Sequence, residues 1–135
     1  MKTMRRGNRR RATAVVETAV VAPLMILGML GMVEVGYAFM IKQTITLAAR
    51  EGARTGSLPG AEMADCQAAV DEAMASANLT GYTVTSNISS LAATDPEVWV
   101  DVSIPFSRVG FTGQLLGGGG FNITSRTSMR REGVN

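Results

Sequence analysis

A long apolar stretch at residues 12–41 constrains this chain more than any other feature. Only Glu17 and Glu34 interrupt it with charge, and the sixteen residues between them carry none. As a helix those sixteen residues would span about 24 Å, and the whole stretch about 45 Å. A bilayer's hydrocarbon core is about 30 Å thick and needs about twenty apolar residues. The stretch therefore predicts a transmembrane helix, with the membrane segment at about residues 18–41.

The basic residues are concentrated in front of this stretch. Six of the thirteen Lys and Arg residues lie within the first eleven positions, whereas eleven acidic residues outnumber seven basic ones from residue 12 onward. A basic tail is one signature of nucleic-acid binding. Beside an apolar helix, the positive-inside rule explains it more simply. We predict no nucleic-acid partner, an unstructured cytoplasmic leader at residues 1–11, and a C-terminal part that lies across the lipid bilayer.

The helical pattern continues beyond the membrane segment. Small or apolar side chains recur every three or four residues up to Gly52, and Gly56 followed by Pro59 and Gly60 ends the pattern. We expect one helix from about Thr13 to about Thr55, within a long-helix region at residues 12–56. Pro23 lies inside this helix and lacks a backbone donor, so a kink is expected there.

Residues 57–135 are predicted to form a small α+β head. A second helix is expected at residues 61–77. Its apolar face is predicted to contain Met63, Cys66, Val70, Ala73 and Ala77. Three later runs, at residues 82–89, 97–106 and 121–130, alternate apolar and polar side chains. This alternation predicts a roughly three-stranded antiparallel sheet with one solvated face and one face packed on a helix.

The alternation also predicts which strand residues face the core. The inward set is Tyr82, Val84, Ile88, Val98, Val100, Val102, Ile104, Phe106, Phe121 and Ile123. The connection between the last two runs is expected to contain a helical turn around Val109, Phe111 and Leu115.

The chain displays few groups suited to catalysis. Histidine is absent, which removes the commonest general base and metal ligand. The four glycines at residues 117–120 lack the Lys and Ser/Thr of a phosphate-binding loop. We predict no catalytic residue, no metal site and no cofactor. Cys66 is the single cysteine; we assign it to helix packing, with a disulfide between subunits as the alternative.

Glu17 is the most informative single residue, because a charge at the centre of a bilayer costs about 3 kcal/mol or more. Two interpretations remain open. Glu17 reaches water at the cytoplasmic interface, six residues after Arg11, or it is a buried anion that pairs with a cation of another subunit. Glu34 is expected at the outer membrane interface, where Tyr37 and Phe39 would form part of an aromatic boundary.

A cleaved secretory signal is a competing explanation of the same region. Residues 1–11 resemble the basic part of a signal peptide, and residues 36–38 resemble a small-residue cleavage site. However, Glu17 interrupts the apolar region, which is also too long, and the helical pattern runs through the proposed cut. We therefore favour a retained membrane anchor.

Three segments resemble the TadE-like family of the bacterial tight-adherence (Tad) pilus systems. They are RRATAVVETAVVAP at residues 10–23, GMVEVG at 31–36 and AAREGAR at 48–54. The ending TSMRRE at residues 127–132 is also similar to the close of many such chains. The strong resemblance covers about residues 10–60, and the head is similar only in general pattern.

The resemblance implies a pilin-like protein, a minor pilin or pseudopilin, that acts in assembly of a type IV-like Tad pilus. It implies a single-pass protein of the bacterial inner membrane, with a cytoplasmic N-terminus and an extracytoplasmic head. The implied partners are other pilin-like subunits, the Tad assembly machinery and a prepilin peptidase. The alternative is an unprocessed membrane protein whose head binds a ligand outside any filament.

The resemblance also implies roles for individual residues. In pilin-like chains a peptidase cuts before the apolar helix, and a glutamate five positions after the cut neutralises the new N-terminal amine during assembly. Here the cut would fall between Ala12 and Thr13, and Glu17 would act in subunit assembly. Ala12 stands where glycine is usual, and Thr18 stands where an aromatic residue is common.

Overall fold

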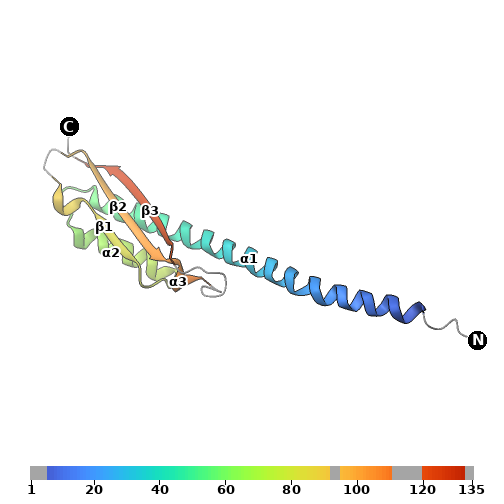
Figure 1. Cartoon of the computed structure of the whole chain (residues 1–135). Helices are drawn as coiled ribbons and strands as arrows, with labels where there is room; N and C mark the ends of the chain where they lie inside the picture. Colours follow the sequence, from blue (N-terminus) through green and yellow to red (C-terminus); the bar gives the residue numbers. More distant parts are fainter. Residues whose placement is uncertain (1–5, 92–94, 111–119, 133–135) are drawn as a thin grey trace, which may run out of the picture. The chain divides into compact units, whose positions relative to one another are not determined.

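The apolar stretch forms part of one helix, α1, which runs from Arg6 to Gly56 (Figure 1). The computed structural model describes residues 6–91, 95–110 and 120–132. The helix begins before the predicted start at Thr13, so residues 6–11 are helical rather than unstructured. Arginine and alanine have high helix propensity, which favours a helix that extends into the basic segment. The helix continues through Pro23 without a break, and the kink there stays a prediction.

The chain divides into two compact units, Met1–Val35 and Gly36–Asn135. In the first unit α1 exposes its large apolar side chains, among them Val15, Val20, Leu24, Met25 and Met29. Among the described residues α1 is the one helix that is long and apolar enough to cross a membrane, over Ala12–Gly56. This length and composition are compatible with a single-pass membrane anchor.

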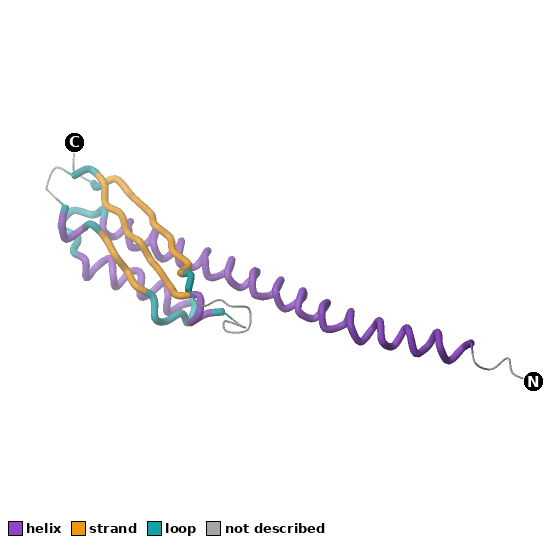
Figure 2. The backbone as a smooth tube through the Cα atoms, viewed as in Figure 1, coloured by secondary structure: helices purple, strands orange, loops and turns teal. Residues whose placement is uncertain are grey.

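The second unit contains the end of α1 together with the other elements (Figure 2). These are α2 (Met63–Ser76), β1 (Thr83–Ser86), the 3₁₀ turn η1 (Ile88–Ser90), β2 (Glu97–Pro105), α3 (Phe106–Val109) and β3 (Asn122–Arg130). The predicted head began at residue 57, whereas this unit begins at Gly36. The reason is that α1 supplies part of its core, through Ile41, Ile45, Ala48, Ala49 and Ala53.

Two glycines of α1 allow α2 and the sheet to approach it closely. A Cβ atom on Gly52 would lie 2.7 Å from Val70 Cγ2, and one on Gly56 would lie 2.8 Å from Cys66 Sγ. Real side chains do not tolerate such distances. The small residues of the 48–54 segment are therefore packing residues.

The second helix is shorter than predicted, and only part of its predicted apolar face is fully buried: Met63 and Ala73 are half-buried. Cys66, Val70 and Met74 are buried, whereas the predicted Ala77 is exposed. Intervals of four residues keep these three side chains on one side of the helix. The helix ends before Asn78, which has a φ of 53°, a left-handed conformation that asparagine adopts more readily than most residues.

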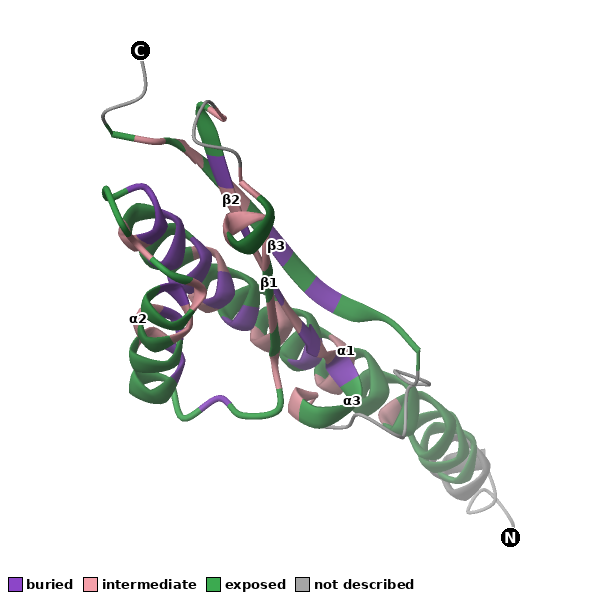
Figure 3. Cartoon of the chain, turned by 90° about the vertical axis from the view of Figure 1, so that its left-hand side faces the viewer, coloured by how far each residue is buried: buried purple, intermediate pink, exposed green. Residues whose placement is uncertain are grey.

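The sheet is antiparallel with the strand order β1-β2-β3. All the inward residues predicted for β2 and Phe106 are buried, as Figure 3 shows for the strand. The first strand is shorter than the predicted run. Beyond it, the Asn87 side chain accepts a hydrogen bond from Trp99 N at 2.8 Å and donates one to Glu97 O at 3.1 Å. This side chain takes the place of strand pairing, and η1 follows.

The last strand departs from prediction at its start. Ile123 is buried as predicted, but Phe121 is 53% exposed and stacks on Phe106, with 4.6 Å between ring centroids. The predicted helical turn is present as α3, which includes Val109. Phe111 and Leu115, also assigned to that turn, lie outside the described residues.

Candidate functional site

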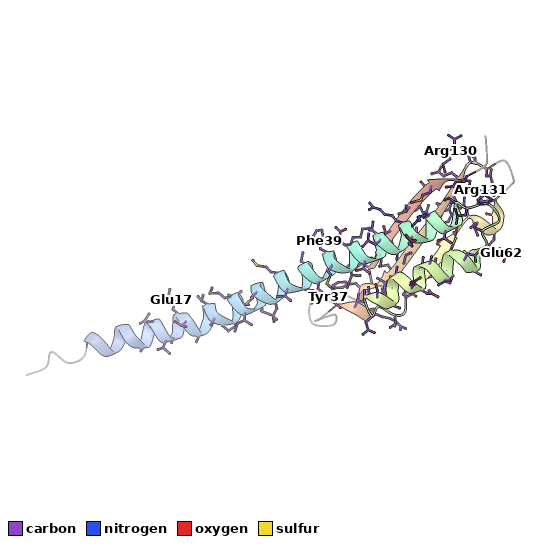
Figure 4. The ribbon with its side chains drawn as sticks, turned by 180° about the vertical axis from the view of Figure 1, so that it is seen from behind. Glu17, Tyr37, Phe39, Glu62, Arg130 and Arg131 are labelled. Carbon is purple, nitrogen blue, oxygen red and sulfur yellow. The ribbon has the colours of Figure 1, made fainter. Side chains whose placement is uncertain are left out.

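Glu17 lies on the exposed surface of α1 in the first unit (Figure 4). It borders a shallow groove of about 290 Å³ that is also lined by Thr18, Val21, Ala22 and Met25. The groove wall is largely apolar, so the carboxylate is the one charged group among the residues that line it.

The polar group nearest to Glu17 in sequence is satisfied locally. The Thr18 hydroxyl donates a hydrogen bond to the carbonyl oxygen of Ala14 at 2.9 Å. This is the usual way in which threonine is accommodated inside a helix. Thr18 therefore adds little polarity to the groove, and Glu17 supplies its charge.

The predicted cleavage position lies inside α1. Ala12 and Thr13 are both exposed, and both are helical. A peptide bond has to leave the helical conformation before it can enter the extended binding site of a peptidase. Helix ends open at small cost compared with helix centres, and Ala12 lies in the second turn from Arg6. Cleavage at this position would thus require only local unwinding.

The second predicted charge of the apolar stretch has a different environment. Glu34 is only 6% exposed, and its predicted position at the outer membrane interface stays a prediction. Of the two predicted boundary aromatics, Tyr37 is partly buried against the core of the second unit and Phe39 is 65% exposed. Glu17 and Glu34 are therefore not equivalent positions.

One polar cluster of the head joins α2 to the start of the sheet. The Asp71 carboxylate accepts hydrogen bonds at 2.7 Å from Tyr82 Oη and from Gln67 Nε2. Partial burial, and then the hydrogen bond to Asp71, raise the pKa of Tyr82 to about 12. A tyrosine that stays neutral at all physiological pH values acts here as a structural donor.

Cys66 faces the core and contributes packing. Its side chain is fully buried, and burial followed by the neighbouring Asp65 charge raises the pKa of its thiol. A buried neutral thiol is a poor nucleophile. These observations favour the packing role over a disulfide between subunits.

The outward face of the sheet carries a cluster that sequence patterns do not reveal. Arg126 Nε lies 3.1 Å from Asp101 Oδ2, and its guanidinium lies 4.2 Å from the centroid of the Trp99 ring. Register explains this contact, because Asp101 lies opposite Arg126 in the β2–β3 pairing. Asp101 and Arg126 are 25 residues apart in sequence, so no local signal identifies the pair.

Within the described part of the chain, no group of three or more His, Cys, Asp or Glu side chains is arranged to hold a metal ion. The notable polar groups fall into three separate places: the Glu17 groove, the Asp71–Tyr82 cluster and the outward face of the sheet.

Residues 12–54 match the family model described as TadE-like protein. This match confirms the resemblance drawn from the three sequence segments, and it includes Ala12, Thr13, Glu17 and Pro23. Over these residues of the apolar helix, the chain is similar to TadE-like proteins. No curated protein and no solved structure matched the chain.

Proposed function

We propose that this protein is a minor pilin or pseudopilin that acts in assembly of a Tad pilus. The observation that carries the proposal is Glu17, a single carboxylate at the start of an apolar helix, within the segment that matches the TadE-like family. The protein is a structural and assembly component, not an enzyme. Its partners are other pilin-like subunits and the Tad assembly machinery.

The proposed location is the bacterial inner membrane. The exposed apolar side chains of the first unit suit contact with lipid. The arginines before the helix keep the N-terminus in the cytoplasm under the positive-inside rule, so the head lies outside. The protein enters the pilus, or supports its assembly, from this position.

The proposed mechanism pairs Glu17 with a new N-terminal amine. A prepilin peptidase cuts between Ala12 and Thr13, which leaves a free ammonium group on Thr13. In a bundle of apolar helices, an unpaired carboxylate or ammonium is costly. The Glu17 carboxylate of one subunit therefore accepts the ammonium group of a neighbour. The pair specifies the axial register of the incoming helix more than it adds net stability.

The proposal is tested by the variant Glu17→Gln, which keeps the size and hydrogen bonding of the side chain but removes its charge. Membrane insertion should be unchanged, since the amide is cheaper to insert than a carboxylate. Pilus formation, counted by electron microscopy, should fall sharply. Glu51→Gln is the matched control, because Glu51 is exposed on the same helix in the second unit. Normal piliation in Glu17→Gln would overturn the assembly role.

A second candidate is an unprocessed single-pass membrane protein whose head binds a ligand outside any filament. The observation that favours it is Ala12, which stands where pilin-like chains usually have glycine, inside a helix. This candidate predicts that residues 1–12 remain on the mature protein and that Glu17→Gln has no effect on pili.

A further inference from the structure

The charges of the second unit are divided unevenly between its elements. α2 and the residue before it carry four carboxylates and no basic side chain. We name this set the acidic flank: Glu62, Asp65, Asp71 and Glu72, all exposed. The ion pairs Arg54–Glu51 and Arg126–Asp101 include no member of the acidic flank, so among the described residues no cation forms an ion pair with these four carboxylates.

One side of α1 is basic and faces β3. Lys42, Thr46 and Arg50 follow each other at intervals of four residues and therefore lie along the same side of the helix. Lys42 Nζ donates a hydrogen bond to the Thr124 carbonyl, and the Thr46 hydroxyl lies 3.0 Å from Ser125 Oγ. Arg50 continues this row and is exposed.

The strand beside this row adds further positive charge. β3 contains Arg126 and Arg130 and no acidic residue. Arg126 is paired with Asp101, whereas Arg130 lies opposite Glu97 without an ion pair between them. We name the cations on this side without an ion pair among the described residues the basic flank: Lys42, Arg50 and Arg130.

The two flanks lie at opposite edges of the sheet. β1 and β3 are the two edge strands, and the hydrogen bond from Tyr82 to Asp71 joins α2 to the β1 side. Figure 3 shows α2 and β3 on different sides of the unit, and Figure 4 shows Glu62 and Arg130 on opposite sides of α1. One copy therefore presents a negative surface on one side and a positive surface on the other.

The basic flank also includes backbone groups of β3 that point away from β2. The hydrogen bonds Phe106 N to Phe121 O and Arg131 N to Pro96 O continue the β2–β3 ladder at both ends. Backbone groups alternate in direction along an antiparallel strand, so the odd-numbered residues of β3 pair with β2. The even-numbered residues direct their N–H and C=O groups to the open edge, where Lys42 binds one of these carbonyls. An open edge of this kind favours contact with another chain.

We propose that the acidic flank of one copy binds the basic flank of a second copy of this chain. Charge complementarity selects the occupant, since contact between two like flanks would oppose charges of one sign. The contact joins two different surfaces. After each addition, the assembly therefore still has a free acidic flank at one end and a free basic flank at the other. Repetition extends a row instead of closing a dimer. This inference rests on the proposed function, because it describes how the heads of adjacent pilin-like subunits meet.

The test uses the full-length chain in micelles of a neutral detergent, with two variants that each reverse one flank. Glu72→Lys alters the acidic flank, and Arg130→Glu alters the basic flank; neither side chain has an ion pair in the described structure. Association is measured by energy transfer between labelled copies and by sedimentation. Each variant alone should associate roughly three- to tenfold more weakly than the natural chain.

An equimolar mixture of the two variants should recover the association. When the acidic flank of a Glu72→Lys copy meets the basic flank of an Arg130→Glu copy, the introduced lysine faces the introduced glutamate. In the opposite arrangement, the acidic flank of the Arg130→Glu copy meets the basic flank of the Glu72→Lys copy, and both flanks keep their natural charges. Glu51→Lys makes the same chemical change outside both flanks, at an exposed ion pair of α1, and should leave association unchanged. High salt should weaken the natural contact.

A natural chain that stays monomeric in micelles, or a mixture that associates no better than the single variants, would overturn the inference. Either outcome leaves the proposed function standing if Glu17→Gln still abolishes pili. If Glu17→Gln forms pili normally while the mixture recovers association, the proposed function fails and the contact between flanks remains.

Discussion

The two parts of α1 have opposite relations to their surroundings, although they form one helix. In the first unit large side chains are exposed around the helix, and Met32 is 79% exposed. In the second unit one side of the helix is buried, with Ile45 fully inaccessible, and alanines and glycines recur on that side. The first part presents apolar surface outward, as a lipid-facing helix does. The second part has the pattern of a core helix in a water-soluble domain.

This difference shows that apolar content alone does not define what a helix does. The first part exposes large apolar residues over most of its length, and its one buried residue among those with a described side chain is Glu34, near its end. The second part buries one side, where Ile41 and Ile45 are followed by small residues that allow close approach of α2 and the sheet. Its charged residues, Lys42, Arg50, Glu51 and Arg54, are all exposed. The transition lies near Gly36, where the second unit begins.

The largest predicted effect compares matched isoleucines in the two parts. Ile45→Ala should destabilise the head by about 2–5 kcal/mol, because it leaves a cavity in a fully buried site. Ile26→Ala, at a position that is 59% exposed in the first unit, should leave the unfolding of the head unchanged. Thermal unfolding of both variants in the same detergent measures the comparison. Equal losses would mean that the two parts do not differ as described.

Glycine substitutions give the next largest effect. Gly52→Ala places a Cβ atom 2.7 Å from Val70 Cγ2, and overpacking of this kind costs about 1–3 kcal/mol. Gly28→Ala meets nothing within 4 Å and should leave the stability of the head unaltered. Limited proteolysis measures this difference, because the head of Gly52→Ala should be cleaved faster than the head of Gly28→Ala. A head that tolerates Gly52→Ala fully would show that α1 and α2 are less closely packed than described.

The head should lose stability at high pH through Tyr82. The pKa of Tyr82 is raised to about 12 in the folded head, against about 10 in an unfolded chain. The folded state therefore binds the Tyr82 proton more tightly than the unfolded state does. The stabilisation of the head by protonated Tyr82 is fully present below a pH of about 10. It is lost as pH rises to about 12. Tyr82→Phe should remove this pH dependence and, by deleting a hydrogen bond to Asp71, cost about 1 kcal/mol at neutral pH.

The smallest predicted effect concerns two ion pairs of the head. Arg126→Ala removes both the contact with Asp101 and the cation–π contact with Trp99, with an expected loss of about 1 kcal/mol. Arg54→Ala removes only an exposed pair with Glu51 and should cost about 0.5 kcal/mol or less. Chemical denaturation measures the loss of unfolding free energy in each variant. A larger loss in Arg54→Ala than in Arg126→Ala would argue against the Trp99 contact.

The sequence predicted the features that depend on local patterns. Alternation identified all three strands and the buried face of β2, and the sixteen uncharged residues identified the apolar helix. Features that depend on tertiary contacts were missed. β1 ends early because the Asn87 side chain binds the backbone of β2, and Met74 rather than Ala77 completes the buried stripe of α2.

The candidate sites also divide into features that local sequence patterns reveal and features that depend on tertiary contacts. Glu17 is conspicuous in sequence because a lone charge in an apolar run requires no knowledge of the fold. The groove beside it becomes apparent only once side chains are placed on the helix. The acidic flank lies on one element and is visible as a run of carboxylates, whereas the basic flank combines α1 with β3 and requires their spatial arrangement.

The most direct test of the account is the mass and N-terminal sequence of the protein extracted from bacterial membranes. The proposed processing between Ala12 and Thr13 predicts a membrane-bound product that begins at Thr13 and retains the whole apolar helix. A product that still carries residues 1–12, or one that has lost the helix by cleavage after Ala38 and is found outside the membrane, would contradict it.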